Sequence, residues 1–357
     1  ATQGGQPTGS SFKPFTLAAA IEQGINPATM IDCTNPMTIT GGKELWNFGN
    51  TNYGIRSIAS ATTVSSNTGY YRLAEKVTPA AMNEMAQRLG ANFETQNLPI
   101  ATLGTENVTP LDMAKAYATF ATGGMRHEAV AVTKIVDKNG NVVYEAPTSD
   151  EGERVISEEV AGAVTKVLRT VFESSDGTAY GMMPTNGQPV AGKTGTVQEF
   201  RGHWLVGYSP QLSCAAWIGS RNYEQTDEDL TANYLWRDFM SRALAGTEIV
   251  QFPETKDPEY KNPFNTEQKE KYAKQTQEEK DKELAAKAAG AVGLSLSDAA
   301  SLLNGYDVSY TEEYSSSVAA GIVISQSVQN GKIVLVVSKG PKPVDPTPTP
   351  TPTPTPD

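Results

Sequence analysis

Gly9-Ser10-Ser11-Phe12-Lys13-Pro14, followed by an apolar run from Phe15 to Ile21, predicts a helix that begins at or just before Ser10. Proline is tolerated in a first helical turn, where its missing N–H would have no partner. Lys13 follows Ser10 by one turn, which places its amine on the same face as the Ser10 hydroxyl. Serine needs an adjacent base to act as a nucleophile, and a helix N-terminus favours developing negative charge. The pattern therefore indicates a serine activated by a lysine.

Two further motifs make this loose pattern specific. Lys193-Thr194-Gly195-Thr196 lies in a predicted strand, where Gly195 removes a side chain and lets a ligand backbone approach closely. Ser65-Ser66-Asn67 lies at the junction of two predicted helices. Each motif alone has an ordinary alternative, such as a helix cap, a strand threonine or a solvated lysine. All three in this order favour an active site over those alternatives.

Composition excludes several other classes of protein. The chain has 357 residues and a formal net charge of -11, which argues against nucleic acid and anionic membrane surfaces as partners. Cys33 and Cys214 are too few for a zinc site, and we expect two buried thiols rather than a disulfide. Only His127 and His203 are available for a His-dependent triad or metal site. We therefore expect no metal and no cofactor, and we expect His203 to be a partly exposed structural residue.

Helix caps, turn residues and hydrophobic periodicity predict the main elements. Threonine followed by proline opens helices that run from Pro79 to Leu89 and from Pro110 to Ala121. Asn139-Gly140 predicts a hairpin turn between residues 129 and 144. The remaining predictions are a loop-rich excursion over residues 24–50, helices over 55–64, 70–76, 158–173 and 230–244, and strands over 189–197, 203–208 and 212–220. On the last helix, Trp236, Phe239 and Met240 are expected to face the core.

The motif order S-x-x-K, S-x-N, K-T-G resembles that of penicillin-binding proteins and serine β-lactamases. The surroundings are similar to the transpeptidase domain of class A penicillin-binding proteins over most of residues 1 to 250. Three matching stretches are Val108-Thr109-Pro110-Leu111, Val190-Ala191-Gly192-Lys193-Thr194-Gly195-Thr196 and Trp204-Leu205-Val206-Gly207-Tyr208. The resemblance implies an α+β fold, an antiparallel sheet flanked by helices.

The resemblance also implies a peptidoglycan D,D-transpeptidase. Ser10 would attack the D-Ala-D-Ala peptide bond of a stem peptide and form an acyl-enzyme, a step that β-lactam antibiotics mimic and stall. Lys13 would be the base, and it would have to lose about three pKa units, a cost of about 4 kcal/mol that burial and the nearby cation Lys193 could supply. Lys193 would also attract the substrate carboxylate.

The remaining site residues are assigned by the same resemblance. Ser65 would pass a proton toward the leaving amine, and Asn67 would hold the substrate amide. Thr194, Gly195 and Thr196 would bind the substrate, with both threonine hydroxyls on its carboxylate. The backbone N–H groups of Ser10 and Thr196 would form the oxyanion hole.

The chain is predicted to hold two domains, a linker and a tail. Residues 1–250 form the transpeptidase domain, and residues 251–289 form a charged linker with helical i,i+4 pairs of glutamate and lysine. Residues 290–340 are similar to a PASTA domain, a small α/β module, through Gly321-Ile322-Val323-Ile324-Ser325-Gln326-Ser327 and Val336-Val337-Ser338-Lys339-Gly340. Residues 341–357 are a Pro-Thr repeat, expected to be disordered.

Only nine residues precede Ser10, whereas the family fold places sheet strands and a helix before the nucleophile. We therefore expect a C-terminal fragment of a longer protein, whose other parts would include a glycosyltransferase domain and the membrane anchor that holds the enzyme at the outer face of the bacterial cytoplasmic membrane. The strand near residues 212–220 would then be an open apolar edge. Acylation of this chain by β-lactams is expected to be poor or absent without the upstream sequence.

Two alternatives to transpeptidation stay open. A D-Ala-D-Ala carboxypeptidase would use water in place of the acceptor amine. A non-catalytic sensor would bind muropeptides or β-lactams, with the PASTA-like module as its recognition element. A β-lactamase is disfavoured, because no identifiable carboxylate is positioned to activate a deacylating water.

Overall fold

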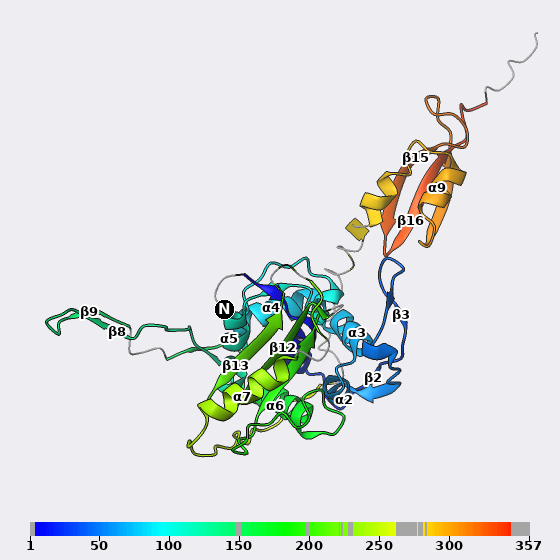
Figure 1. Cartoon of the computed structure of the whole chain (residues 1–357). Helices are drawn as coiled ribbons and strands as arrows, with labels where there is room; N and C mark the ends of the chain where they lie inside the picture. Colours follow the sequence, from blue (N-terminus) through cyan, green and yellow to red (C-terminus); the bar gives the residue numbers. More distant parts are fainter. Residues whose placement is uncertain are drawn as a thin grey trace, which may run out of the picture. The chain divides into compact units, whose positions relative to one another are not determined.

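A computed structural model of the chain describes residues 4–146, 151–197, 200–220, 222, 224–227, 231–261, 277, 281–282 and 284–343. The chain divides into two compact units, Ala1–Ala273 and Lys274–Asp357. The first unit holds every predicted site residue. Figure 1 shows its sheet and helices and, separately, the small second unit.

The sheet of the first unit has the three predicted strands. β11 (Ala191–Thr196), β12 (Gly202–Tyr208) and β13 (Ser213–Gly219) are antiparallel in that spatial order, with Thr196 opposite His203. Every residue of β12 is buried. Among the described strands β13 pairs only with β12, so it forms the edge that the sequence predicted.

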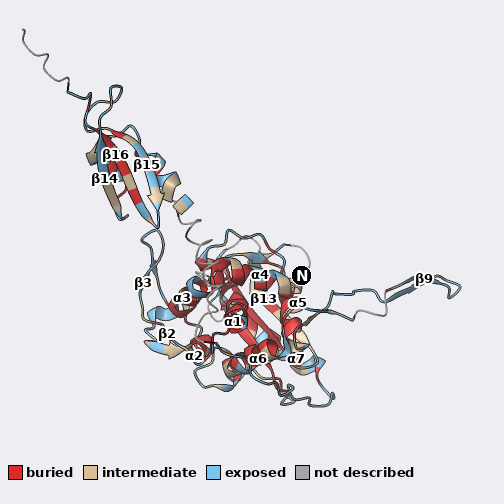
Figure 2. Cartoon of the chain, turned by 180° about the vertical axis from the view of Figure 1, so that it is seen from behind, coloured by how far each residue is buried: buried red, intermediate tan, exposed pale blue. Residues whose placement is uncertain are grey.

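Helices cover the sheet because alternate residues of β12 point to opposite faces. Trp204, Val206 and Tyr208 join the larger core with helix α1, whereas Leu205 packs in a second core with Trp236 of α7. The helices that pack on the sheet or on α1 are α1 (Lys13–Glu22), α3 (Asn67–Val77), α4 (Pro79–Leu89), α5 (Pro110–Ala121), α6 (Glu158–Glu173) and α7 (Ala232–Ala243). Figure 2 shows α1 in the buried centre of the unit.

The predicted helix starts are confirmed by their caps. The Thr78 side chain accepts from the N–H of Ala81 at the start of α4, and the Thr109 side chain accepts from the N–H of Asp112 at the start of α5. The opening stretch differs slightly from the prediction, because a 3₁₀ turn, η1 (Gly9–Phe12), precedes α1.

Two local predictions were wrong. The run predicted as helix from residue 55 begins as strand β5 (Ile55–Ser57), which pairs with β2 (Met30–Asp32), and α2 covers only Ile58–Thr63. On α7, Trp236 is buried but Phe239 is 49% exposed, because helix rotation turns Phe239 away from the sheet.

Short elements complete the first unit. The excursion, taken here as residues 24–57, carries β2, β3 (Met37–Thr38), β4 (Glu44–Leu45), η2 (Phe48–Asn50) and β5. The predicted hairpin about Asn139-Gly140 is confirmed as β8 (Lys134–Val136) and β9 (Val142–Glu145), and both strands are exposed along their whole length. The other short elements are β1 (Gln6–Pro7), η3 (Pro99–Leu103), β6 (Asn107–Val108), β7 (Met125–Arg126) and β10 (Glu153–Arg154).

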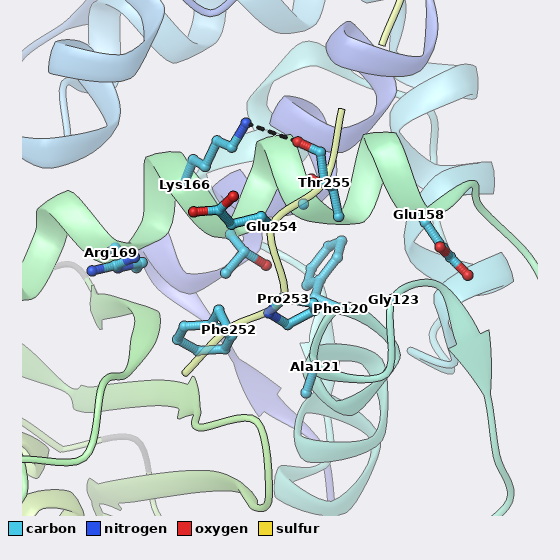
Figure 3. Close-up of a pocket in the computed structure, with 12 residues that line it drawn as sticks. Phe120, Ala121, Gly123, Glu158, Lys166, Arg169, Phe252, Pro253, Glu254 and Thr255 are labelled. Carbon is cyan, nitrogen blue, oxygen red and sulfur yellow. Dashed lines mark hydrogen bonds between the residues drawn. The ribbon is translucent and has the colours of Figure 1, made fainter. Parts of the chain in front are cut away.

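Residues 251–261, predicted as the start of a helical linker, instead run in an irregular, non-helical conformation against the first unit. Val250 exchanges two hydrogen bonds with the Gln188 side chain, and the Phe252 ring meets Tyr208 edge to face at 5.7 Å. Thr255 crosses α6 at Gly162, where any Cβ would overlap the threonine hydroxyl. A cavity of about 380 Å³ lies beside this segment, between α6 and the end of α5. Figure 3 shows residues that line it, and none of them is a predicted site residue.

The second unit combines helix and strand, as predicted for a small α/β module. Helix α9 (Leu296–Leu302) precedes β14 (Val308–Glu313), β15 (Val323–Gln329) and β16 (Lys332–Ser338), in the order β14-β16-β15. Helical residues 284–289, predicted as linker, contribute to this unit, because Ala288 is fully buried in its core. The predicted glutamate–lysine pairs of the linker include residues outside the part that the structure describes. The Pro-Thr tail from residue 344 also lies outside it.

The prediction for the two cysteines can also be compared with the structure. Cys33 and Cys214 are both free thiols, Cys33 buried and Cys214 half-buried. Among the residues that the structure describes, no helix is long and apolar enough to cross a bilayer.

Candidate active site

The nucleophile turn η1 packs directly against strand β11 through two glycines. Gly9 has φ +54°, and a Cβ there would lie 2.6 to 3.0 Å from the backbone of Thr196. A Cβ on Gly195 would overlap the carbonyl oxygen of Thr8 and lie 3.0 Å from the N–H nitrogen of Ser11. We predicted that Gly195 leaves space for a ligand, but here the chain's own turn fills that space. Half-buried Ser10 is therefore held beside the end of β11.

The backbone N–H of Thr196 lies on the side of β11 that does not pair with β12. Val197 donates its N–H to the Gly202 carbonyl across the β11–β12 ladder. Because successive N–H groups of a strand point to opposite sides, the N–H of Thr196 points away from β12, toward η1. This is the direction that the predicted oxyanion hole requires.

The S-x-N motif forms a tight turn between α2 and α3. Ser65 adopts φ +60°, the left-handed conformation that closes many helices and that glycine occupies most easily. Ser66 caps α3 by accepting from the N–H of Gly69, and Asn67 is the first residue of α3. The motif thus lies at the predicted helix junction, with Ser65 in a strained conformation.

Lys13 is fully buried, and its amine points into this turn. In its charged form, its Nζ donates to the Ser65 carbonyl at 2.7 Å, to Ser65 Oγ at 3.2 Å and to Asn67 Oδ1 at 2.9 Å, and it lies 5.4 Å from the centre of the Tyr70 ring. No hydrogen bond of the described residues joins Ser10 Oγ to Lys13 Nζ.

Lys193 reaches the same serine from β11. Its Nζ donates to Ser65 Oγ at 2.8 Å and to the Thr194 carbonyl at 3.1 Å, and its side chain is also fully buried. Since a hydroxyl oxygen has two lone pairs, Ser65 Oγ can serve both amines. The hydroxyl therefore forms a bridge between the two lysines.

Both amines are shifted toward their neutral forms. Burial lowers the pKa of Lys13 well below its usual value, and the neighbouring charge of Lys193 lowers it further. Burial lowers the pKa of Lys193 to about 7. A neutral lysine has a free lone pair, so each amine in its neutral form is chemically able to take up a proton.

The predicted substrate-binding threonines flank this network. Thr194 Oγ1 and Thr178 Oγ1 are 2.6 Å apart, and Thr196 is exposed at the end of β11. Sequence reasoning missed Thr178, because it lies outside the three motifs, in the connection from α6 to β11. Asn67, predicted to hold a substrate amide, donates its Nδ2 to the Trp46 carbonyl at 2.9 Å.

The aromatic rings near the site include one departure from prediction. His203 is buried rather than partly exposed, and its ring stacks on Phe200 at 5.9 Å. Phe200 in turn meets Phe48 of the excursion edge to face at 6.0 Å. This contact joins the segment after the K-T-G strand to the excursion beside the S-x-N turn.

The described residues contain no group of three or more histidine, cysteine or acidic side chains that could hold a metal ion. Hydrogen bonds join Lys13, Ser65, Asn67, Lys193 and Thr194, and backbone packing brings the turn of Ser10 to β11. The three motifs, far apart in sequence, therefore meet in one place.

This fold and this meeting of a serine turn with two buried lysines define the class of penicillin-recognising serine domains. The chain belongs to the penicillin-binding protein transpeptidase family, whose sequence model, penicillin binding protein transpeptidase domain, matches residues 1–241. The PASTA domain model matches residues 291–339. Both family resemblances seen in the sequence are thus confirmed.

Two relatives with known names are penicillin-binding proteins, in agreement with this family. Penicillin-binding protein 1A of Mycolicibacterium smegmatis is 35% identical over 281 residues, and that of Mycobacterium tuberculosis is 34% identical over 285 residues. Each match covers 70% of this chain but only 35% and 34% of the relative, so the chain spans about a third of their length.

Solved structures show the same fold. The penicillin-binding protein PonA1 from Mycobacterium tuberculosis matches with a TM-score of 0.66 and 31% identity, over 72% of this chain and 74% of that one. A second structure of PonA1, in complex with penicillin V, matches with a TM-score of 0.65, 31% identity and the same coverage.

Proposed function

We propose that this chain carries a serine-type peptidoglycan D,D-transpeptidase with Ser10 as nucleophile. The observation that carries the proposal is the double hydrogen bond at Ser65 Oγ, 3.2 Å from Lys13 Nζ and 2.8 Å from Lys193 Nζ, next to the turn that holds Ser10. Two buried amines with lowered pKa values beside a serine on a helix N-terminus are suited to acyl transfer.

The first half-reaction forms the acyl-enzyme. Neutral Lys13 takes the proton from Ser10 Oγ as the oxygen attacks the D-Ala-D-Ala carbonyl, and the oxyanion lies at the N–H groups of Ser10 and Thr196. The C–N bond then breaks, and the leaving D-alanine nitrogen receives its proton through the Ser65 hydroxyl. Lys193 and the hydroxyls of Thr194 and Thr196 hold the substrate carboxylate.

The second half-reaction transfers the acyl group. An amine of a neighbouring stem peptide attacks the ester, Ser10 regains its proton, and a cross-link forms. No carboxylate of the described residues forms an ion pair with Lys13 or Lys193, whose amines bond to Ser65, Asn67 and Thr194. This supports a long-lived acyl-enzyme rather than rapid β-lactam hydrolysis.

The setting follows from the same proposal. The substrates are peptidoglycan stem peptides, with β-lactams as inhibitors, and the domain acts at the outer face of the bacterial cytoplasmic membrane. In a full-length class A protein, an anchor and a glycosyltransferase would accompany it. Muropeptide binding by the PASTA domain is a proposal of its own, tested by titrating soluble muropeptides into the full chain.

The test of acylation uses an end point, because we expect labelling to be slow. The chain is incubated with saturating fluorescent penicillin, and the intact mass and the labelled peptide are measured. The proposal expects one adduct on Ser10 and none in the Ser10→Ala variant. An adduct at another residue contradicts it, and so does the absence of an adduct in a full-length class A protein that contains this chain.

Transpeptidase and carboxypeptidase are separated by their products. With a donor stem peptide and an acceptor amine, the proposal expects peptide dimers that depend on Ser10. D-alanine release without dimers indicates the carboxypeptidase, and β-lactam binding without either product indicates a sensor.

A further inference from the structure

Asn47, which belongs to none of the three motifs, is almost completely buried beside the S-x-N turn, at 2% exposure. Its Oδ1 accepts four hydrogen bonds from the first residues of α3: from the N–H of Asn67 at 2.7 Å, the N–H of Thr68 at 3.1 Å, Ser66 Oγ at 3.1 Å and Thr68 Oγ1 at 3.3 Å. The Asn47 side-chain oxygen is thus the common acceptor for donors of residues 66–68.

The other end of the same side chain is fixed in the excursion. Asn47 Nδ2 donates to the carbonyls of Cys33 at 3.1 Å and Thr51 at 3.0 Å. Its backbone N–H donates to Asn35 Oδ1 at 2.8 Å. All the polar atoms of the amide are therefore used, and Asn47 ties the excursion to the start of α3.

The turn needs such a support. The first N–H groups of a helix have no partners within the helix, and Ser66 satisfies only that of Gly69. Ser65 holds a left-handed conformation that is unfavourable for a residue with a side chain. Without the Asn47 oxygen, the N–H groups of Asn67 and Thr68 would lose their acceptor, and the turn could relax.

The turn at residues 65–68 also holds the Lys13 amine. Two of the three oxygen acceptors of Lys13 are the Ser65 carbonyl and Asn67 Oδ1. Asn67 is fixed at its backbone by Asn47 and at its side chain by the carbonyl of Trp46, the residue before Asn47. A shift of the turn therefore moves the oxygens that orient the amine.

We propose that Asn47 is a positioning residue for acylation, and that its side-chain oxygen fixes the Ser65–Thr68 turn so that the turn aims the Lys13 amine at its task. The inference rests on the proposed function, in which Lys13 is the base. Asn47 itself touches neither the nucleophile nor the amine, and it acts through Ser65 and Asn67.

Asn35→Ala is the matched control. Asn35 lies in the same excursion and holds the Asn47 backbone, but it forms no hydrogen bond to residues 65–68 among the described residues. The rate of Ser10 labelling by fluorescent penicillin is measured from pH 5.5 to 9.5, with the unfolding temperature of each variant. We expect Asn47→Ala to lower the rate by about 30-fold, since small misplacements cost up to about 10²-fold, and Asn35→Ala to change it by about twofold or less.

A second readout does not depend on activity. The titration of Lys13 is followed by NMR with lysine labelled at ¹³Cε, the signal being assigned by its loss in Lys13→Arg. The titratable groups that face this amine are Lys193 on β11, Tyr70 on α3 and Cys33 in the excursion. Loosening the turn lets water reach the amine, so Asn47→Ala is expected to raise its midpoint by about one pH unit, whereas Asn35→Ala leaves it unchanged.

Asn47→Asp keeps an acceptor oxygen and is the second variant if Asn47→Ala does not fold. It is expected to retain about a third or more of the labelling rate. The proposal is overturned if Asn47→Ala and Asn35→Ala behave alike in both measurements, or if Asn47→Asp loses as much as about 30-fold. Failure of the unaltered chain to label at Ser10 bears on the proposed function and not on Asn47, whose role the NMR titration still decides.

Discussion

Helix α1 and the hairpin β8–β9 break the usual pattern of burial in opposite ways. In α1 a lysine is fully buried in a row of apolar residues, whereas in the hairpin Val143 is 67% exposed and Tyr144 is 45% exposed. The buried lysine has three oxygen acceptors within 3.2 Å, so its cost is compensated by a specific network. The hairpin valines have no such network. The comparison teaches that a buried amine with built partners marks the site, whereas exposed apolar residues alone do not.

The largest effect in this comparison is expected when the buried amine of Lys13 is removed. Lys13→Met is expected to lower the rate of Ser10 labelling by about 10³-fold, within the usual range for loss of a general base. The unfolding temperature should fall moderately, because the Ser65 carbonyl and Asn67 Oδ1 lose a buried donor. Labelling rate and calorimetry check the two parts. A variant that labels normally but unfolds earlier would show that Lys13 is only structural.

The pH dependence of stability tests the same burial at Lys193. Its pKa is about 7 in the folded chain and about 10.4 when unfolded, so between these values the unfolded state binds the extra proton. Stability should therefore rise with pH across this window, and below pH 7 the full penalty applies. The penalty is at most about 5 kcal/mol, for a pKa difference of about 3.4 units at about 1.4 kcal/mol for each unit.

Lys193→Met provides the reference for that measurement. The difference in unfolding free energy between this variant and the unaltered chain should shrink as the pH rises from about 7 to 10. Denaturant unfolding at several pH values measures it. A difference that is independent of pH would mean that Lys193 is not buried in its neutral form.

Two glycines compare backbone packing in the two regions. A Cβ on Gly195 would overlap the Thr8 carbonyl, whereas a Cβ on Gly140 in the hairpin would meet nothing within 4 Å. Gly195→Ala is expected to cost about 2 to 3 kcal/mol by overpacking and to slow Ser10 labelling. Gly140→Ala, with φ +86°, should cost about 1 kcal/mol from backbone strain and leave labelling unchanged. Equal losses of stability would contradict the packing of η1 against β11.

The smallest effect is expected on the hairpin surface. Val143→Thr should change the free energy of unfolding by less than about 0.5 kcal/mol, as for most exposed positions. Thermal unfolding of the full chain measures it. A loss above about 1 kcal/mol would show that the hairpin valines are packed in solution.

Local signals allowed much of the fold to be predicted. Thr78-Pro79 and Thr109-Pro110 mark helix starts through side-chain caps a few residues away, and Asn139-Gly140 marks its turn by backbone preference alone. The burial of Lys13 was inferred from the chemistry that a lysine base requires. The caps and the turn need only the sequence near each residue, whereas the role of Lys13 came from three motifs far apart in the sequence.

Long-range contacts could not be predicted in the same way. The close neighbour of Gly195 is Thr8, far away in sequence, and the partners of Asn47 lie in another element. The packing of residues 251–261 on α6 depends on Gly162 and Thr255, which carry no local signal for each other. Where tertiary packing decides, as for Phe239 and His203, composition and periodicity gave the wrong exposure.

The left-handed backbone at Ser65 has a consequence for engineering this chain. Glycine would adopt φ +60° more easily, so Ser65→Gly would be a natural choice in a search for greater heat resistance. That choice would remove the one oxygen that Lys13 and Lys193 share. A library selected only for thermal stability should therefore favour a more stable protein that is inactive. Ser65 should be kept fixed in such a library.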